Sequence, residues 1–165
     1  MPSPAPNQPI TLRALTDGDR FRLRRWLAEP HVIAWFGSRG AAEAAVALAA
    51  QSPTAVQRII TRDDGAIGYA HALDIEDRRL PPATWHADAF IGSALHRGQG
   101  LGARALALLR DEVFATTLAS ALAVRISINN ERQVRAIERA GFRWHTIGPD
   151  PVLGPCWWLL AARGE

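Results

Sequence analysis

The stretch that decides the fold is Ala94-Leu95-His96-Arg97-Gly98-Gln99-Gly100-Leu101-Gly102-Ala103. A predicted strand, residues 85–94, leads into it, and the apolar residues of 101–109 recur at the i, i+4, i+7 and i+8 spacing of a helix face. Alternating glycines at such a junction let backbone N–H groups approach an anion closely. The helix N-terminus adds unpaired donors and positive dipole, and Arg97 adds charge. We therefore predict a pyrophosphate-binding loop over His96–Ala103.

Four interpretations of this loop differ in the ligand that they imply. A Walker P-loop needs GxxxxGK followed by Ser or Thr, and no such run occurs. Residues 98–103 formally satisfy the dinucleotide fingerprint GxGxxG/A, but about twenty positions later Ala123 and Arg125 stand where an acidic residue belongs. Residues 97–102 satisfy the coenzyme A loop of GNAT acetyltransferases, Arg/Gln-x-x-Gly-x-Gly/Ala. A glycine-rich connection that binds nothing is the fourth interpretation.

Hydrophobic periodicity and turn signals predict the remaining elements outward from the loop. Before the loop these are a strand at 10–15, a helix at 16–27, a short helical or irregular segment at 31–36, a helix at 40–51, and a hairpin of strands 54–61 and 66–73 around a turn at 63–65. After the loop they are a strand at 121–128, a helix at 131–140, and strands 142–146 and 156–161 around a turn at 148–154. Long strands feeding helices indicate a mixed α/β sheet. We expect a single domain over residues 10–165, preceded by a disordered Pro-rich tail at residues 1–9.

Composition and charge exclude several classes of protein. The 165 residues are 48% apolar and 21% charged, which is typical of a globular domain. No stretch approaches the ~20 apolar residues that span a bilayer, and the N-terminus lacks the features of a signal peptide. The single Cys156 cannot form an internal disulfide, and no His/Cys cluster has zinc-ligand spacing. The formal charge of +3 comes mainly from arginines interspersed with acids, which favours a solvated face over a nucleic-acid patch. We therefore expect a cytoplasmic protein that binds neither membrane nor nucleic acid.

Motifs outside the loop resemble the GNAT superfamily of N-acetyltransferases. Residues 85–103, followed by a helix, a strand, Asn130 and then Glu138-Arg139-Ala140-Gly141-Phe142, resemble its recurrent pattern. More narrowly, the chain resembles the aminoglycoside 6'-N-acetyltransferases. Trp26–Gly37 resembles the family pattern WL-x-x-x-H-[IV]-x-x-W-[WF]-G, and Ile67–Ala70 resembles IGYA. Asp88–Ile91 occupies the place of the family pattern I-D-Q-F-L. The resemblance extends from about Thr11 to Arg163, which is nearly the whole chain.

The resemblance implies a GNAT fold, in which a mixed, mostly antiparallel sheet is flanked by helices and splayed between its fourth and fifth strands. It also implies acetyl-CoA as co-substrate, no metal, and a pantetheine arm lying in the gap between those strands. By this carry-over, the backbone of Phe90, Ile91 and Ser93 pairs with the pantetheine, and Asn130 lies near the thiol end. The residues expected at the pyrophosphate are Arg97, Gly98, Gln99, Gly100, Leu101, Gly102 and Ala103.

The predicted reaction is direct attack of an amine on the thioester in a ternary complex. The resemblance makes Asp88 the base, and its position also suits holding a substrate cation. His86 points to the same strand face and is a candidate to assist or replace Asp88, although a non-catalytic histidine is the commoner case. A backbone N–H near Ile91 would stabilise the oxyanion, and Trp35 and Trp85 are candidate walls of the acceptor pocket. The remaining histidines carry no further signal: His31, His71, His96 and His145.

The chain departs from the family pattern in three places. Ile137 stands where many members have a tyrosine that protonates the departing thiolate. Arg125 stands where an aminoglycoside-binding aspartate falls, and the acidic loop at 74–84 is shortened. We therefore expect weak activity at best on polycationic aminoglycosides, and better activity on an amine with one positive charge or fewer.

Several functions remain open at this stage. The leading hypothesis is acetyl transfer from acetyl-CoA to a primary amine of a small molecule, aminoglycoside-like or other, by a monomer or homodimer. Alternatives are a siderophore-type lysine side-chain N-acyltransferase, a protein N-acetyltransferase, and a non-catalytic acyl-CoA-binding module, which the absence of a tyrosine at Ile137 favours. Turnover of acetyl-CoA with a panel of amines discriminates among them.

Overall fold

The computed structural model describes residues 9–165, so the tail predicted for residues 1–9 lies, except for Pro9, outside the described residues. The elements along this part of the chain are β1 (Thr11–Ala14), η1 (Asp17–Asp19), α1 (Arg20–Trp26), α2 (Pro30–Phe36), α3 (Arg39–Gln51), β2 (Val56–Arg62), β3 (Gly65–Leu73), β4 (Thr84–Ile91), η2 (Ala94–His96), α4 (Leu101–Thr116), β5 (Ala121–Ser127), α5 (Glu131–Arg139), β6 (Arg143–Asp150) and β7 (Gly154–Ala162).

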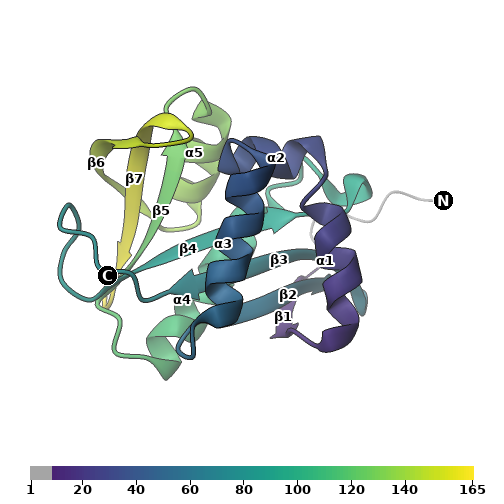
Figure 1. Ribbon diagram of the computed structural model, residues 1–165. Coiled ribbons are helices and arrows are strands. Elements are labelled where there is room, and N and C mark those ends of the chain that lie inside the picture. The colour runs from purple at the N-terminus through teal and green to yellow at the C-terminus, as the bar shows by residue number, and fades with distance from the viewer. Residues whose placement is uncertain (1–8) are drawn as a thin grey trace.

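The strands form one seven-stranded sheet in the order β1-β2-β3-β4-β5-β7-β6. Each neighbouring pair is antiparallel except β4 and β5, which run parallel. Figure 1 shows α1 and α3 crossing in front of the sheet, whereas α4 passes behind it. The expected mixed α/β sheet flanked by helices is therefore confirmed.

The period-2 alternation of the strands divides the interior into two cores. Ile60, Ala70 and Ile91 pack with α4 residues on one face of the sheet. Their neighbours Ile59, Tyr69 and Phe90 pack with α1, α2 and α3 on the other face. Successive strand residues point to opposite faces, so each strand stabilises both layers at once.

The sheet opens between β4 and β5. The two strands pair only where Thr84–His86 lies beside Ala121–Ala123. From Ala87 onward β4 stays paired with β3, while within residues 9–165 its other edge has no strand partner. The predicted splay between the fourth and fifth strands is confirmed, and it leaves main-chain groups of β4 free to bind a ligand.

Several boundaries differ from the sequence prediction. The predicted helix at 16–27 is a 3-10 turn followed by α1. β4 ends at Ile91 rather than Ala94: the N–H groups of Gly92 and Ser93 both donate to the Ile67 carbonyl, so the regular ladder stops there. Gly92 packs directly on Trp26, since a Cβ at Gly92 would lie 2.1 Å from the indole ring. The turn predicted at 148–154 is shorter, since β6 continues to Asp150.

No single helix among the described residues is long and apolar enough to cross a bilayer. α2 and α3 together have sufficient length and apolar composition, but the pair is bent by 74°.

Candidate active site

The glycine loop forms the N-terminus of α4. Gly98 and Gly100 both have φ of +71°, in the left-handed region that glycine adopts at least cost, and Gly100 is the N-cap residue. No side chain caps this helix among the described residues. A Cβ at Gly100 or at Gly102 would meet nothing within 4 Å, so both glycines face open space. The first N–H groups of α4 are therefore exposed to whatever occupies that space.

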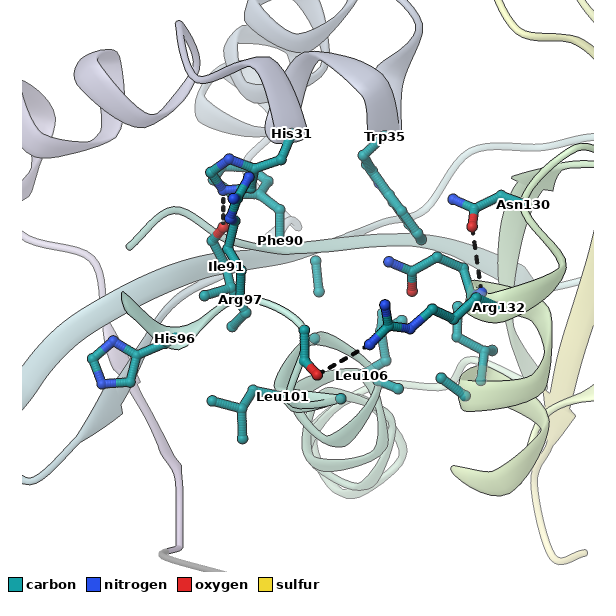
Figure 2. Close-up of a pocket in the computed structure, with 18 residues that line it drawn as sticks. His31, Trp35, Phe90, Ile91, His96, Arg97, Leu101, Leu106, Asn130 and Arg132 are labelled. Carbon is teal, nitrogen blue, oxygen red and sulfur yellow. Dashed lines mark hydrogen bonds between the residues drawn. The ribbon is translucent and has the colours of Figure 1, made fainter. Parts of the chain in front are cut away.

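A cavity of about 490 Å³ extends from this loop along the open edge of β4. Figure 2 shows the residues around it. The sequence-predicted cofactor residues that line it are Phe90, Ile91, Arg97, Gly98, Gly100, Leu101, Gly102, Ala103 and Asn130. The structure thus brings strand β4, the loop and the start of α5 around one space.

Two predicted cofactor residues lie outside this lining. The Ser93 N–H donates to the Ile67 carbonyl (3.1 Å), so it is already used within the protein, and the Ser93 hydroxyl lies 3.0 Å from His96 Nδ1. The Gln99 Oε1 accepts a hydrogen bond from Arg62 Nη1 (2.8 Å). The pairing of Ser93 with pantetheine is corrected accordingly, because β4 ends before it.

Sequence reasoning missed other residues of the first cavity. Arg132, in the first turn of α5, donates from Nη2 to the Gly98 carbonyl (3.2 Å) and adds a second guanidinium beside Arg97. His31 Nε2 donates to the Ile91 carbonyl (2.7 Å) and ties α2 to the end of β4 (Figure 2). The His31 position was visible in the Trp26–Gly37 motif, but only the fold places it against Ile91.

A second cavity, of about 370 Å³, lies between α3, β3, β4 and the β6–β7 turn. Asp88 and His86 both line it, as expected for residues two apart on a strand. Trp35 lines the first cavity, and its indole N–H donates to Asp88 Oδ1 (3.0 Å). Asp88 therefore lies where the two cavities approach each other.

Asp88 belongs to a hydrogen-bonded chain that crosses the sheet. His71 faces it across the β3–β4 pair, with Nε2 3.2 Å from Asp88 Oδ2. His71 Nδ1 lies 3.1 Å from the Tyr69 hydroxyl, which donates to Gln57 Oε1 (3.0 Å). No sequence signal distinguished His71, because only the strand register places it opposite Asp88.

The environment of Asp88 keeps its carboxyl ionised. Burial is the largest influence and acts to raise the pKa of Asp88. The hydrogen bond from His71 and the charges of His71 and Arg125 outweigh burial, so the pKa of Asp88 lies below its usual value.

His86 makes no hydrogen bond to Asp88. Its ring packs edge-on against Trp158, with 5.2 Å between ring centroids, and its buried Nε2 has no partner among the described residues. Burial lowers the pKa of His86, which favours the neutral ring. His86 thus supplies a polar surface to the second cavity, and His71 rather than His86 lies within hydrogen-bonding distance of Asp88.

Arg125 lines the second cavity as one half of an ion pair. Its Nη1 donates to Oδ2 of the buried Asp150. Asp150 Oδ1 accepts the N–H groups of Val152 and Leu153, each at 2.9 Å. The repulsion expected from Arg125 is therefore largely offset by a carboxylate that sequence spacing did not connect to it.

Two further predicted positions lie in apolar surroundings. Trp85 points into the core on the α4 side, opposite Asp88, and lines neither cavity, so we correct its assignment from acceptor wall to core. Ile137 is buried and lines the first cavity, where it offers no proton donor. Within residues 9–165 no cluster of three or more His, Cys, Asp or Glu is arranged to hold a metal ion.

Comparison with known proteins identifies the family. Residues 10–143 match the acetyltransferase (GNAT) domain. The aminoglycoside N(6')-acetyltransferases type 1 of Klebsiella pneumoniae and Serratia marcescens are each 27% identical over 173 aligned positions, which cover 95% of this chain and 85% of theirs.

Solved structures agree in fold. An aminoglycoside acetyltransferase in complex with coenzyme A has a TM-score of 0.79 at 24% identity, over 94% of this chain and 95% of that one. The spermidine N-acetyltransferase of Vibrio cholerae, in complex with CoA and spermine, has a TM-score of 0.75 at 14% identity, over 94% and 96% of the two chains. Because the family match spans most of its length, this chain belongs to the GNAT acetyltransferase family.

Proposed function

We propose that this enzyme transfers an acetyl group from acetyl-CoA, bound in the first cavity, to a primary amine of a small molecule bound in the second. The observation that carries the proposal is the Trp35–Asp88 hydrogen bond, which joins a residue of one cavity to a carboxylate of the other. The relatives support the choice of reaction, since they are N-acetyltransferases and two were solved with coenzyme A.

The first cavity suits the coenzyme in charge and shape. The open glycines and the N-terminus of α4 offer backbone N–H donors to the pyrophosphate, with Arg97 and Arg132 beside them. The unpaired edge of β4 offers the Ile91 N–H to the pantetheine, since the Ile91 carbonyl is bound by His31, and Asn130 lies at the start of α5 on the opposite wall. The thioester then lies toward Trp35.

The reaction joins the amine nitrogen to the acetyl carbon and breaks the carbon–sulfur bond. Positioning both reactants accounts for a large part of the rate, up to about 7–11 kcal/mol in favourable cases. A main-chain N–H of β4 near Ile91 is our candidate donor to the oxyanion. Ionised Asp88 first holds the ammonium and then takes its proton.

His71 positions Asp88 for this step. Its Nε2 lies 3.2 Å from Asp88 Oδ2, and its Nδ1 lies 3.1 Å from the Tyr69 hydroxyl, which donates to Gln57 Oε1. These contacts hold the imidazole and the carboxylate in one orientation beside the amine.

The thiolate leaves without a tyrosine to protonate it. Tyr69 is the chain's single tyrosine, and it is buried on the far side of His71. A thiol has a pKa of about 8.5 in water, so a thiolate is a competent leaving group near neutral pH. The substitution at Ile137 is therefore compatible with turnover.

Thiol release from acetyl-CoA, measured with a panel of primary amines, tests this proposal. We expect amine-dependent turnover, lowered roughly 100-fold or more by Asp88→Asn because the base is removed while its shape is kept. Calorimetry should give the same acetyl-CoA affinity for both proteins. The exposed Asp111 provides the control, since Asp111→Asn should leave turnover unchanged. Acetyl-CoA binding without turnover of any amine would instead indicate a non-catalytic binding module.

A further inference from the structure

The second cavity contains one carboxylate that is available to a cation. Of the two carboxylates among the described residues that line it, Asp150 is committed on both oxygens to Arg125 and to backbone N–H groups. Asp88 accepts one hydrogen bond on each oxygen, which leaves further lone pairs free, and its side chain is 15% exposed. A ligand with several ammonium groups would therefore leave most of them without a counter-ion.

The loop at residues 74–83 adds no further carboxylate to the lining of the second cavity. Residues 74–83 carry three acids and two arginines, yet only Ile75 of this segment lines the cavity. Asp77 is paired with Arg79 (2.7 Å), so one of these acids is already neutralised. The remaining acids, Asp74 and Glu76, are exposed beside Ile75 and lie outside the lining.

The walls of this cavity are mainly apolar. α3 contributes Ala41, Ala44, Ala45 and Leu48, the sheet contributes Leu73, Ala87 and Trp158, and the adjoining segments contribute Ile75, Pro151 and Val152. Leu48 is 50% exposed and Val152 is 49% exposed. An apolar molecule seated here would remove both side chains from water, which is favourable by roughly 25 cal/mol per Å².

From this arrangement we infer that the acceptor is a monocationic primary amine carried on an apolar body, such as an arylalkyl or alkyl amine. The inference rests on the proposed function, because the amine must reach Asp88 next to the thioester. The ammonium binds Asp88, and the apolar body lies between α3 and the β6–β7 turn. A volume of about 370 Å³ lies at the small end of the range for ligand pockets.

The test compares kcat/KM for 2-phenylethylamine and hexylamine with that for spermidine and kanamycin. We expect both monoamines to exceed both polycations at least 10-fold. Leu48→Glu adds a second carboxylate at the cavity mouth and should shift the ratio toward the polycations at least 10-fold. Phe21→Glu is the matched control: Phe21 is an exposed apolar helix residue that lines neither cavity, so the ratio should stay as in the wild type.

The outcomes separate this inference from the proposed function. Efficient acetylation of kanamycin or spermidine, with poor use of the monoamines, would overturn the inference and leave the acetyltransferase assignment intact. Failure to acetylate any amine would contradict the proposed function. In that case, titration of 2-phenylethylamine onto the CoA-bound protein decides what the second cavity binds: binding that Asp88→Asn weakens supports the inference, and no binding overturns it.

Discussion

Asp88 combines two tasks that ordinarily need different electrostatic environments. Binding a cation requires an ionised carboxylate, and the lowered pKa of Asp88 provides one. Accepting a proton requires that the protonated state also be stabilised, because a carboxylate of low pKa is a weak base. His71 Nε2 lies 3.2 Å from Asp88 Oδ2, within hydrogen-bonding distance of the carboxyl group in either of its states. The functional unit is therefore the pair rather than the carboxylate alone.

At this scale we predict that His71→Gln lowers kcat roughly 10-fold or more. A glutamine amide does not reproduce the contacts that the imidazole makes with both Asp88 and Tyr69, so the carboxylate is less well oriented toward the amine.

Acetyl-CoA affinity serves as the control for this variant, because His71 does not line the first cavity. An unchanged kcat would show that the contact between His71 and Asp88 contributes nothing to turnover.

At the scale of elements, the anion site depends on how α4 begins. Gly100 turns the chain with a positive φ, and the N–H groups of the first helical turn then face the open space beside Gly102. The donors come from the backbone, so their direction is set by the loop conformation and not by side-chain packing.

We predict that Gly102→Asp weakens acetyl-CoA binding at least 10-fold while the protein remains folded. An aspartate in the first turn of a helix is favourable for the helix dipole, yet it places negative charge where the pyrophosphate binds. Calorimetry measures the affinity, and urea denaturation measures the free energy of unfolding.

Gly102→Ala is the control for side-chain size. It adds a methyl group into open space without charge, and alanine is allowed at this place in the coenzyme A motif, so binding should be retained. Equal affinities for the Asp and Ala variants would move the pyrophosphate away from this turn.

At the scale of the molecule, an ion pair far from both cavities connects strand β1 to the start of helix α1. Asp19 is buried at the start of α1 and accepts two hydrogen bonds of 2.7 Å from Arg13 of β1. The Thr16 N–H also donates to it (2.9 Å). The Arg13 hydrogen bonds are the main cause of the lowered pKa of Asp19, so this carboxylate stabilises the fold whenever it is ionised.

We predict that Asp19→Asn lowers the free energy of unfolding at pH 7 by about 1–3 kcal/mol. The folded-state pKa lies below the unfolded value of about 3.9, so the contribution is complete above that pH and is lost as the pH falls below it. Urea denaturation at pH 7 and at pH 3 should therefore give a difference between wild type and variant that shrinks in acid.

Turnover per folded molecule should be unchanged in this variant, since Asp19 lines neither cavity. A difference in stability that is the same at both pH values would show that the carboxylate charge contributes nothing.

Features that depend on local spacing could be predicted from the amino-acid sequence alone. The glycine loop, the helix behind it and the alternation that puts Asp88 on a polar strand face all follow from neighbours within a few residues. The two-residue turn at Asp63 and Asp64 is of the same kind, and its positive φ values close the β2–β3 hairpin. These features could be predicted because the backbone conformation at each position depends mainly on the residue there and on its neighbours in the chain.

Contacts between side chains that are far apart in the sequence could be identified only from the folded structure. The register of β3 against β4 places His71 opposite Asp88, and the β6–β7 turn brings Asp150 to Arg125. Trp85 lies in the core because α4 covers its face of β4. Period-2 alternation fixes which residues share a face, but not which face is covered or which residue lies opposite. The charge and shape of the acceptor cavity are set by these long-range pairings.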